Sequence, residues 1–129
     1  MAQVLSDLFI PGSGCGDVDI AFDGVDLIAR YELRQHGRDR IGRLIFLGVA
    51  AFRFRKEMLS RGFVTAAYDR LVAIDTSAWR TEVENWAPSG MKLSQVRHFA
   101  VFFSSNGYLE VLARDVEVAE PVDEPANGR

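Results

Sequence analysis

The chain has 129 residues, of which 48% are hydrophobic and 26% are charged, and its formal net charge is −3. This length and composition predict one domain with its own core and exclude a wholly disordered chain. The single cysteine, Cys15, excludes an intramolecular disulfide and fits a reducing compartment. We expect no signal segment, because Met1-Ala2-Gln3-Val4 begins neither a basic region nor a long apolar stretch, and no apolar run reaches the roughly 20 residues that span a bilayer. We therefore expect a cytoplasmic protein without a membrane partner.

The first hairpin is predicted around Asp23-Gly24. Apolar and polar residues alternate on both sides of this dipeptide. Asp-Gly favours a two-residue turn because both of its positions accept a positive φ. Such a turn pairs Phe22 with Val25 and places Asp17 opposite Arg30 on the other face of the two strands.

Three segments outside this hairpin are less uniform. Residues 2–9 are ambiguous, because Val4, Leu5, Leu8 and Phe9 fit either one face of a helix or a cap on a sheet. Residues 44–55 predict a strand that is interrupted by a bend or bulge at Gly48. Residues 63–74 fit two short strands, although their alanines and leucine also suit a helix, and the sequence leaves both structures open.

One helix is expected from Ser77 to Trp86. Trp79, Val83 and Trp86 recur with the period of a helix, so we expect them to form its buried face. Pro88 ends the segment. Three residues can serve as the N-cap: Asp75, Thr76 and Ser77.

A second hairpin is predicted around Asn106-Gly107, which separates strand-like segments at 98–103 and 108–118. A two-residue turn there sets His98 opposite Asp115, whereas a four-residue loop gives another register. The sequence does not decide between the two registers.

These elements predict an α+β fold dominated by antiparallel sheet, either a sandwich or a partly open barrel, with one short helix. The domain is expected to cover residues 1–119. Residues 120–129 are rich in proline and acidic residues, which predicts a disordered acidic C-terminal tail. Exposed hairpin edges and strands that are apolar on both faces fit a homodimer.

The usual catalytic and cofactor motifs are incomplete. The Gly-rich loop at 12–16 lacks the Gly-Lys of a phosphate-binding loop and the third glycine of a dinucleotide fingerprint. One cysteine and two separated histidines, His36 and His98, give no metal-ligand spacing. We therefore expect no cofactor, metal or catalytic residue. The alternative is a small enzyme that uses Cys15 as a nucleophile or His98 as a general base beside a carboxylate.

Charge is unevenly distributed along the chain. Five acids and no base precede Arg30, whereas nine bases and three acids lie between Arg30 and Arg61. Folding can bring these stretches together so that their fields cancel, or it can leave a basic face for an acidic partner. That face could also bind a nucleic acid or another anionic ligand, although no nucleic-acid-binding motif is present. The candidate partner-binding residues are Arg30, Arg34, Arg38, Arg40, Arg53, Arg55 and His98.

Three segments together resemble a group of small, uncharacterised bacterial β-rich proteins. They are LIFLGVAAFRFR at 44–55, YDRLVAID with the following SAW at 68–79, and RHFAVFFSSNGYLEVLARDVEV at 97–118. Some proteins of this group look like toxin-immunity proteins, which bind a partner toxin and carry out no chemistry. The resemblance covers roughly residues 17–118 and implies a non-catalytic protein-binding domain, immunity-like or regulatory.

Overall fold

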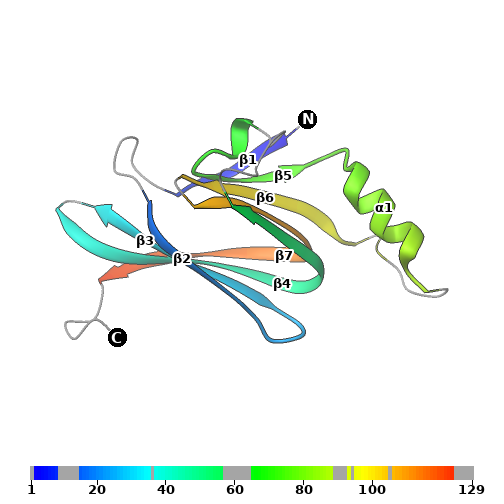
Figure 1. The fold of residues 1–129 in the computed structure, drawn as a ribbon, viewed down its shortest axis with the longest axis horizontal. Coiled ribbons are helices and arrows are strands. Elements are labelled where there is room, and N and C mark those ends of the chain that lie inside the picture. The colour runs from blue at the N-terminus through cyan, green and yellow to red at the C-terminus, as the bar shows by residue number, and fades with distance from the viewer. Residues whose placement is uncertain are drawn as a thin grey trace.

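The computed structural model describes residues 2–8, 15–35, 37–56, 65–88, 93, 95–104 and 106–123. These residues form one antiparallel sheet of seven strands in the order β1-β5-β6-β7-β4-β3-β2, which has two free ends and does not close into a barrel. The predicted sheet-dominated fold with one short helix is confirmed (Figure 1). The elements are β1 (Ala2–Asp7), β2 (Cys15–Phe22), β3 (Leu27–Gln35), β4 (Arg38–Lys56), a 3₁₀ turn (Thr65–Ala67), β5 (Arg70–Ile74), α1 (Ala78–Trp86), β6 (Arg97–Phe103) and β7 (Gly107–Asp123).

Two long strands connect the halves of the sheet. β4 has 19 residues and β7 has 17, and they pair with each other along most of their length. The ladder shifts between Val49 and Ala51, directly after Gly48, which has a φ of +62°. The predicted bend at Gly48 is therefore confirmed. In Figure 1 the β1-β5-β6 side lies above the β2-β3 side, and β4 and β7 curve between them.

The inner face of this curved sheet contains the main hydrophobic core. Its largest fully buried members come from β3, β4, β6 and β7, because inward-facing residues alternate with outward-facing ones along each strand. They include Tyr31, Phe46, Phe99 and Phe103.

α1 packs on the outer face of the sheet. Trp79 and Val83 contact a small cluster that includes Leu112 of β7. Ser77 is the N-cap, because its side chain accepts a hydrogen bond from the Arg80 N–H at 2.9 Å. The expectation that Trp86 is buried is wrong, since 69% of this residue is exposed. Trp79, Val83 and Ala87 pack against this cluster, whereas Trp86 is not among the described residues that do.

The first hairpin has a longer loop than predicted. Phe22 pairs with Leu27 rather than Val25, and Asp19 rather than Asp17 lies opposite Arg30. The Asp23 carboxylate accepts hydrogen bonds from the N–H groups of residues 25 and 26, each at 2.8 Å. These hydrogen bonds stabilise a four-residue loop at 23–26. The register changes by two residues, so Ile20 and Phe22 still share a face with Ala29 and Leu27, whereas Val25 lies in the loop.

The second hairpin adopts neither of the two expected registers. Phe103 pairs with Gly107, which leaves a three-residue loop, and His98 lies opposite Leu112 instead of Asp115. Gly107 belongs to β7 rather than to the turn. A side chain at this position would clash with the Arg55 carbonyl on the neighbouring β4, which explains why glycine occupies it.

Two ambiguous segments and the C-terminal region are also described. Residues 2–7 form a strand that pairs with β5. Residues 65–74 contain the 3₁₀ turn followed by β5, whereas residues 63 and 64 lie outside the described residues. β7 continues through Asp123, four residues into the expected tail, and residues 124–129 lie outside the described part.

Candidate functional site

A buried polar cluster lies between α1 and the outer face of the sheet. His98 of β6 is 5% exposed and Glu110 of β7 is 4% exposed. His98 Nε2 lies 2.9 Å from Glu110 Oε2, and His98 Nδ1 lies 2.7 Å from Ser77 Oγ. We call these three residues the Ser77–His98–Glu110 chain. It joins the N-terminus of α1 to the neighbouring strands β6 and β7.

Arginines from β4 complete the surroundings of Glu110. Arg53 Nε donates a hydrogen bond to Glu110 Oε1 at 2.7 Å, and Arg55 lies 3.6 Å from the same oxygen. Burial raises the pKa of Glu110, but hydrogen bonds from His98 and Arg53 outweigh burial and hold the pKa below its ordinary value. Glu110 is therefore ionised at neutral pH. Three of the seven predicted site residues thus meet around a carboxylate that the sequence analysis missed.

The aromatic ring of Trp79 covers this cluster. It meets the His98 ring edge-on, with centroids 5.3 Å apart, and the Arg53 guanidinium lies 4.2 Å from the Trp79 ring centroid. The cation therefore contacts both a carboxylate and an aromatic face. These contacts hold the first turn of α1 on the sheet.

The order hydroxyl, imidazole, carboxylate is also found in hydrolase triads. Because Glu110 is ionised, the His98 Nε2–H donates to it, and Nδ1 faces the Ser77 hydroxyl. Ser77 Oγ, however, already accepts the Arg80 N–H as the helix cap. The neighbouring pocket, of about 270 Å³, has His98 but not Ser77 among its lining residues. The geometry therefore favours anchoring of α1 over nucleophilic attack by Ser77.

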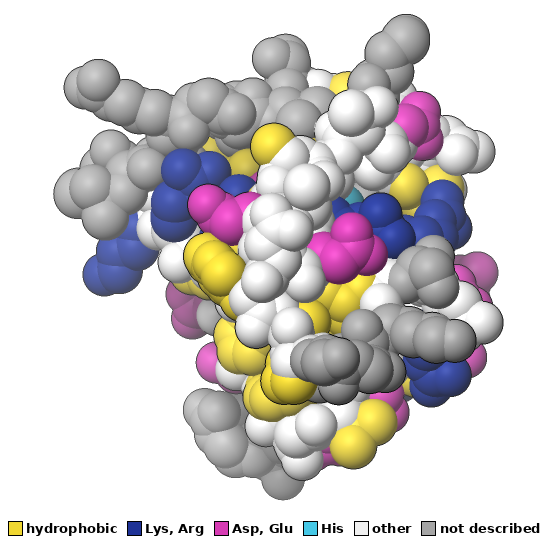
Figure 2. All heavy atoms as spheres, turned by 90° about the vertical axis from the view of Figure 1, so that its right-hand side faces the viewer, with side chains coloured by type: hydrophobic (Ala, Val, Ile, Leu, Met, Phe, Trp, Pro, Cys, Tyr) yellow, Lys and Arg dark blue, Asp and Glu magenta, His cyan; other side chains and the backbone are white. Residues whose placement is uncertain are grey.

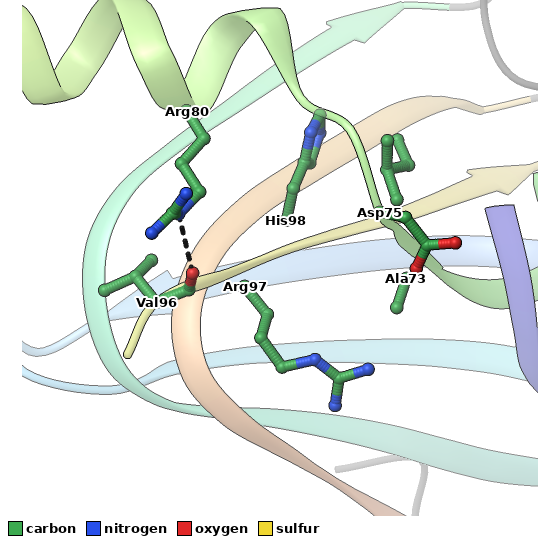
Figure 3. Close-up of a pocket in the computed structure, with 7 residues that line it drawn as sticks. Ala73, Asp75, Arg80, Val96, Arg97 and His98 are labelled. Carbon is green, nitrogen blue, oxygen red and sulfur yellow. Dashed lines mark hydrogen bonds between the residues drawn. The ribbon is translucent and has the colours of Figure 1, made fainter. Parts of the chain in front are cut away.

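That pocket lies where β5 ends and β6 begins (Figure 3). The Arg80 guanidinium donates to the backbone carbonyls of Val96 and Leu93, at 2.8 and 2.7 Å. Figure 3 shows Arg97 on the opposite side of β6 from His98. With Asp75 also in the lining, the pocket presents mixed charges and does not converge on one ligand chemistry.

Cys15 lies far along the sheet from this cluster, against the turn between β6 and β7. The Asn106 side-chain amide nitrogen lies 3.8 Å from its sulfur. Burial raises the pKa of the Cys15 thiol to about 12, with smaller contributions from the carboxylates of Asp69 and Glu32. The thiol is therefore protonated at neutral pH, which is unfavourable for a nucleophile. His36, the other histidine, lies outside the described residues.

The remaining predicted arginines do not join Arg53, Arg55 and His98. They lie toward the opposite end of β4 and on β3, and each contacts a carboxylate. Arg30 lies 3.9 Å from Asp19 and Arg34 lies 3.4 Å from Asp39. Arg38 and Arg40 both contact Asp123 at the end of β7. The structure thus divides the predicted basic face into two groups, both with acidic partners.

Three phenylalanines form an exposed patch that we call the aromatic rim: Phe22 of β2 with Phe52 and Phe54 of β4. They are 45%, 38% and 37% exposed, and the Phe22 and Phe52 ring centroids are 5.2 Å apart. Their ladder partners, such as Leu27 and Val111, are fully buried on the inner face. The rim is therefore where the inner face reaches the surface. Figure 2 shows hydrophobic side chains gathered in the lower half of one side of the molecule.

Comparisons with known proteins leave the chain without a family assignment. No family model matches it, and neither a curated protein nor a solved structure matches it. Within the described residues, no helix is long and apolar enough to cross a membrane. The same residues contain no group of three or more His, Cys, Asp or Glu side chains that could hold a metal ion.

Proposed function

We propose that this chain is a non-catalytic cytoplasmic domain that binds another protein through the aromatic rim, in an immunity-like or regulatory role. The observation that carries the proposal is the exposure of Phe22, Phe52 and Phe54 side by side at the end of the inner face. Aromatic residues are enriched where protein interfaces are buried, because they contribute much apolar area at low entropic cost.

The chemistry of the other candidate residues supports the same proposal. Cys15 has a raised pKa, and the hydrogen bonds of His98 link it to Ser77 and Glu110. An enzyme that relies on either residue therefore has less support. Binding of a nucleic acid by the arginines also has less support, because their nearby carboxylates reduce the positive field that phosphates require.

The experiment compares partner capture by the wild-type chain and by a rim variant, Phe52→Ser/Phe54→Ser. A matched control, Val118→Ser/Val122→Ser, changes two residues of similar exposure, 45% and 48%, on β7. The chains are immobilised and challenged with lysate and secreted proteins of the source cell. We expect the wild type and the control to capture a partner in stoichiometric amount. We expect the rim variant to bind that partner at least about tenfold more weakly.

Two results would contradict the proposal. One is equal capture by the rim variant and the control, which would place the partner elsewhere. The other is a wild-type homodimer in light scattering that the rim variant converts to monomer, because the rim would then be covered by a second copy of this chain.

A further inference from the structure

In the part of the chain that the structure describes, one edge of the sheet is open beside the aromatic rim. Among the described residues β2 pairs with β3 alone, so its other side lacks a strand neighbour. Asn106 donates to the Gly16 carbonyl at 2.8 Å and thereby covers the start of the strand. The open length is residues 17–22, which ends at Phe22 of the rim. An edge of this kind is a template for pairing with another extended chain.

The side chains of this edge are apolar on one face of the strand and acidic on the other. Val18 and Ile20 pack toward the main core, whereas Asp17 and Asp19 face solvent. The Asp19 side chain is 83% exposed, and its contact with Arg30 is a long 3.9 Å ion pair at the surface, which contributes little. An incoming strand would therefore meet apolar side chains on one face and exposed carboxylates on the other.

A second copy of this chain does not provide a complementary strand. Pairing β2 with β2 of another copy would bring acidic side chains opposite each other, which is destabilising. The other free edge, β1, has the sequence AQVLSD and contains no basic residue. Both edges of a second copy thus lack the cations that this edge requires.

We propose that residues 17–22 of β2 accept an extended segment of the partner protein in which basic side chains alternate with apolar ones. The segment adds a strand to the sheet, its basic side chains face Asp17 and Asp19, and its apolar side chains continue the inner face toward Phe22. This inference rests on the proposed function and specifies the chemistry of the partner. It assigns the edge to recognition of charge and the rim to apolar contact.

The probe is the synthetic peptide acetyl-Lys-Val-Lys-Val-Lys-Val-Lys-amide, titrated into the ¹⁵N-labelled full-length chain. Two control peptides are the same sequence with Glu in place of Lys and the Lys-Val peptide with alternate backbone nitrogens methylated. We expect amide shifts centred on residues 17–22 with the Lys-Val peptide. We expect at least tenfold weaker binding of both controls, and weaker binding at higher salt.

Charge-reversal variants connect the binding to this edge. We expect the variant Asp17→Lys/Asp19→Lys to bind the Lys-Val peptide at least tenfold more weakly than wild type and to bind the Glu-Val peptide more tightly. Asp115→Lys/Glu117→Lys changes the net charge equally on exposed residues of β7, which β4 and β3 separate from β2, and is expected to bind like wild type.

Two results would overturn the inference: no amide shifts at β2 when the Lys-Val peptide is added, or equal affinity for the methylated and unmethylated Lys-Val peptides. The peptide titration uses no rim substitution, so its failure is distinguishable from failure of the proposed function. If partner capture depends on the rim but the Lys-Val peptide causes no shifts at β2, only the edge proposal is removed. If the peptide binds at β2 but the rim variant captures the partner as well as the control does, only the rim proposal is removed.

Discussion

Glu110 is the residue on which the buried polar cluster depends. It lies between apolar residues of β7, and a carboxylate in such a position is costly to bury unless charged groups and hydrogen bonds compensate for it. Arg53 and His98 provide this compensation from the two neighbouring strands. An acid inside an otherwise apolar strand segment was the sequence signal that could have identified it.

Replacement of Glu110 by Gln tests this dependence. We expect the free energy of unfolding to fall by about 2–3 kcal/mol at pH 7, because Arg53 then lies against a neutral amide. The pKa of Glu110 is lowered in the folded chain, so its stabilisation is present above its ordinary pKa of 4.5 and is lost as the pH falls through the lower folded value. Urea unfolding from pH 7 to pH 3 should show the two chains converging at acid pH.

The exposed Glu117→Gln variant is the control for Glu110, and we expect a change within about 0.5 kcal/mol. A Glu110→Gln chain as stable as wild type at pH 7 would contradict the proposed role of the carboxylate.

Cys15 provides a second test at the scale of the residue. A pKa of about 12 in place of 9.0 lowers the thiolate fraction at pH 8 by about a thousandfold. We expect alkylation by iodoacetamide, followed by mass spectrometry, to be slow for the folded chain and to reach the rate of a free thiol in urea. A fast reaction in the folded state would instead restore the hypothesis of a cysteine nucleophile.

The elements show which predictions local sequence could support. The helix was predicted, with Ser77 as one of three candidate caps, because a helix and its cap depend on neighbours within one turn, such as Ser77 and Arg80. Both hairpin turns were located, but their registers were not, because these depend on contacts outside the dipeptides. Asp23 closes the first loop with its side chain, and Gly107 is required by the Arg55 carbonyl on another strand. The carboxylate partner of His98 could not be identified without the register of the second hairpin, which pairs β6 with β7.

Ser77 has two roles in α1, as its N-cap and as a hydrogen-bond partner of His98. We expect Ser77→Ala to lower the free energy of unfolding by about 1–2 kcal/mol and to increase hydrogen exchange in the first turn of the helix. Thr76→Ala, at an exposed neighbouring position, should change neither quantity. Unchanged exchange in the Ser77→Ala chain would show that Trp79 packing alone holds the helix.

At the scale of the whole molecule, the bend in β4 decides which surfaces are exposed. It lets one sheet cover its own inner face, and this arrangement leaves the aromatic rim and the β2 edge at the surface. The sequence predicted a bend at Gly48 but not its consequence, because coverage of a face depends on how distant strands pack. The predicted basic face was divided for the same reason, since β4 carries its arginines to opposite ends of the sheet.

Gly48 allows a direct test of this bend. Its φ of +62° disfavours any side chain, and a Cβ there would also clash with the Arg114 guanidinium. Gly37 has a similar φ of +73° but has no neighbour within 4 Å of an added Cβ, so Gly37→Ala measures the backbone cost alone. We expect about 1 kcal/mol of destabilisation for Gly37→Ala and about 2–3 kcal/mol for Gly48→Ala by urea unfolding. Equal values would mean that Arg114 moves aside freely and that the bend depends on backbone conformation alone.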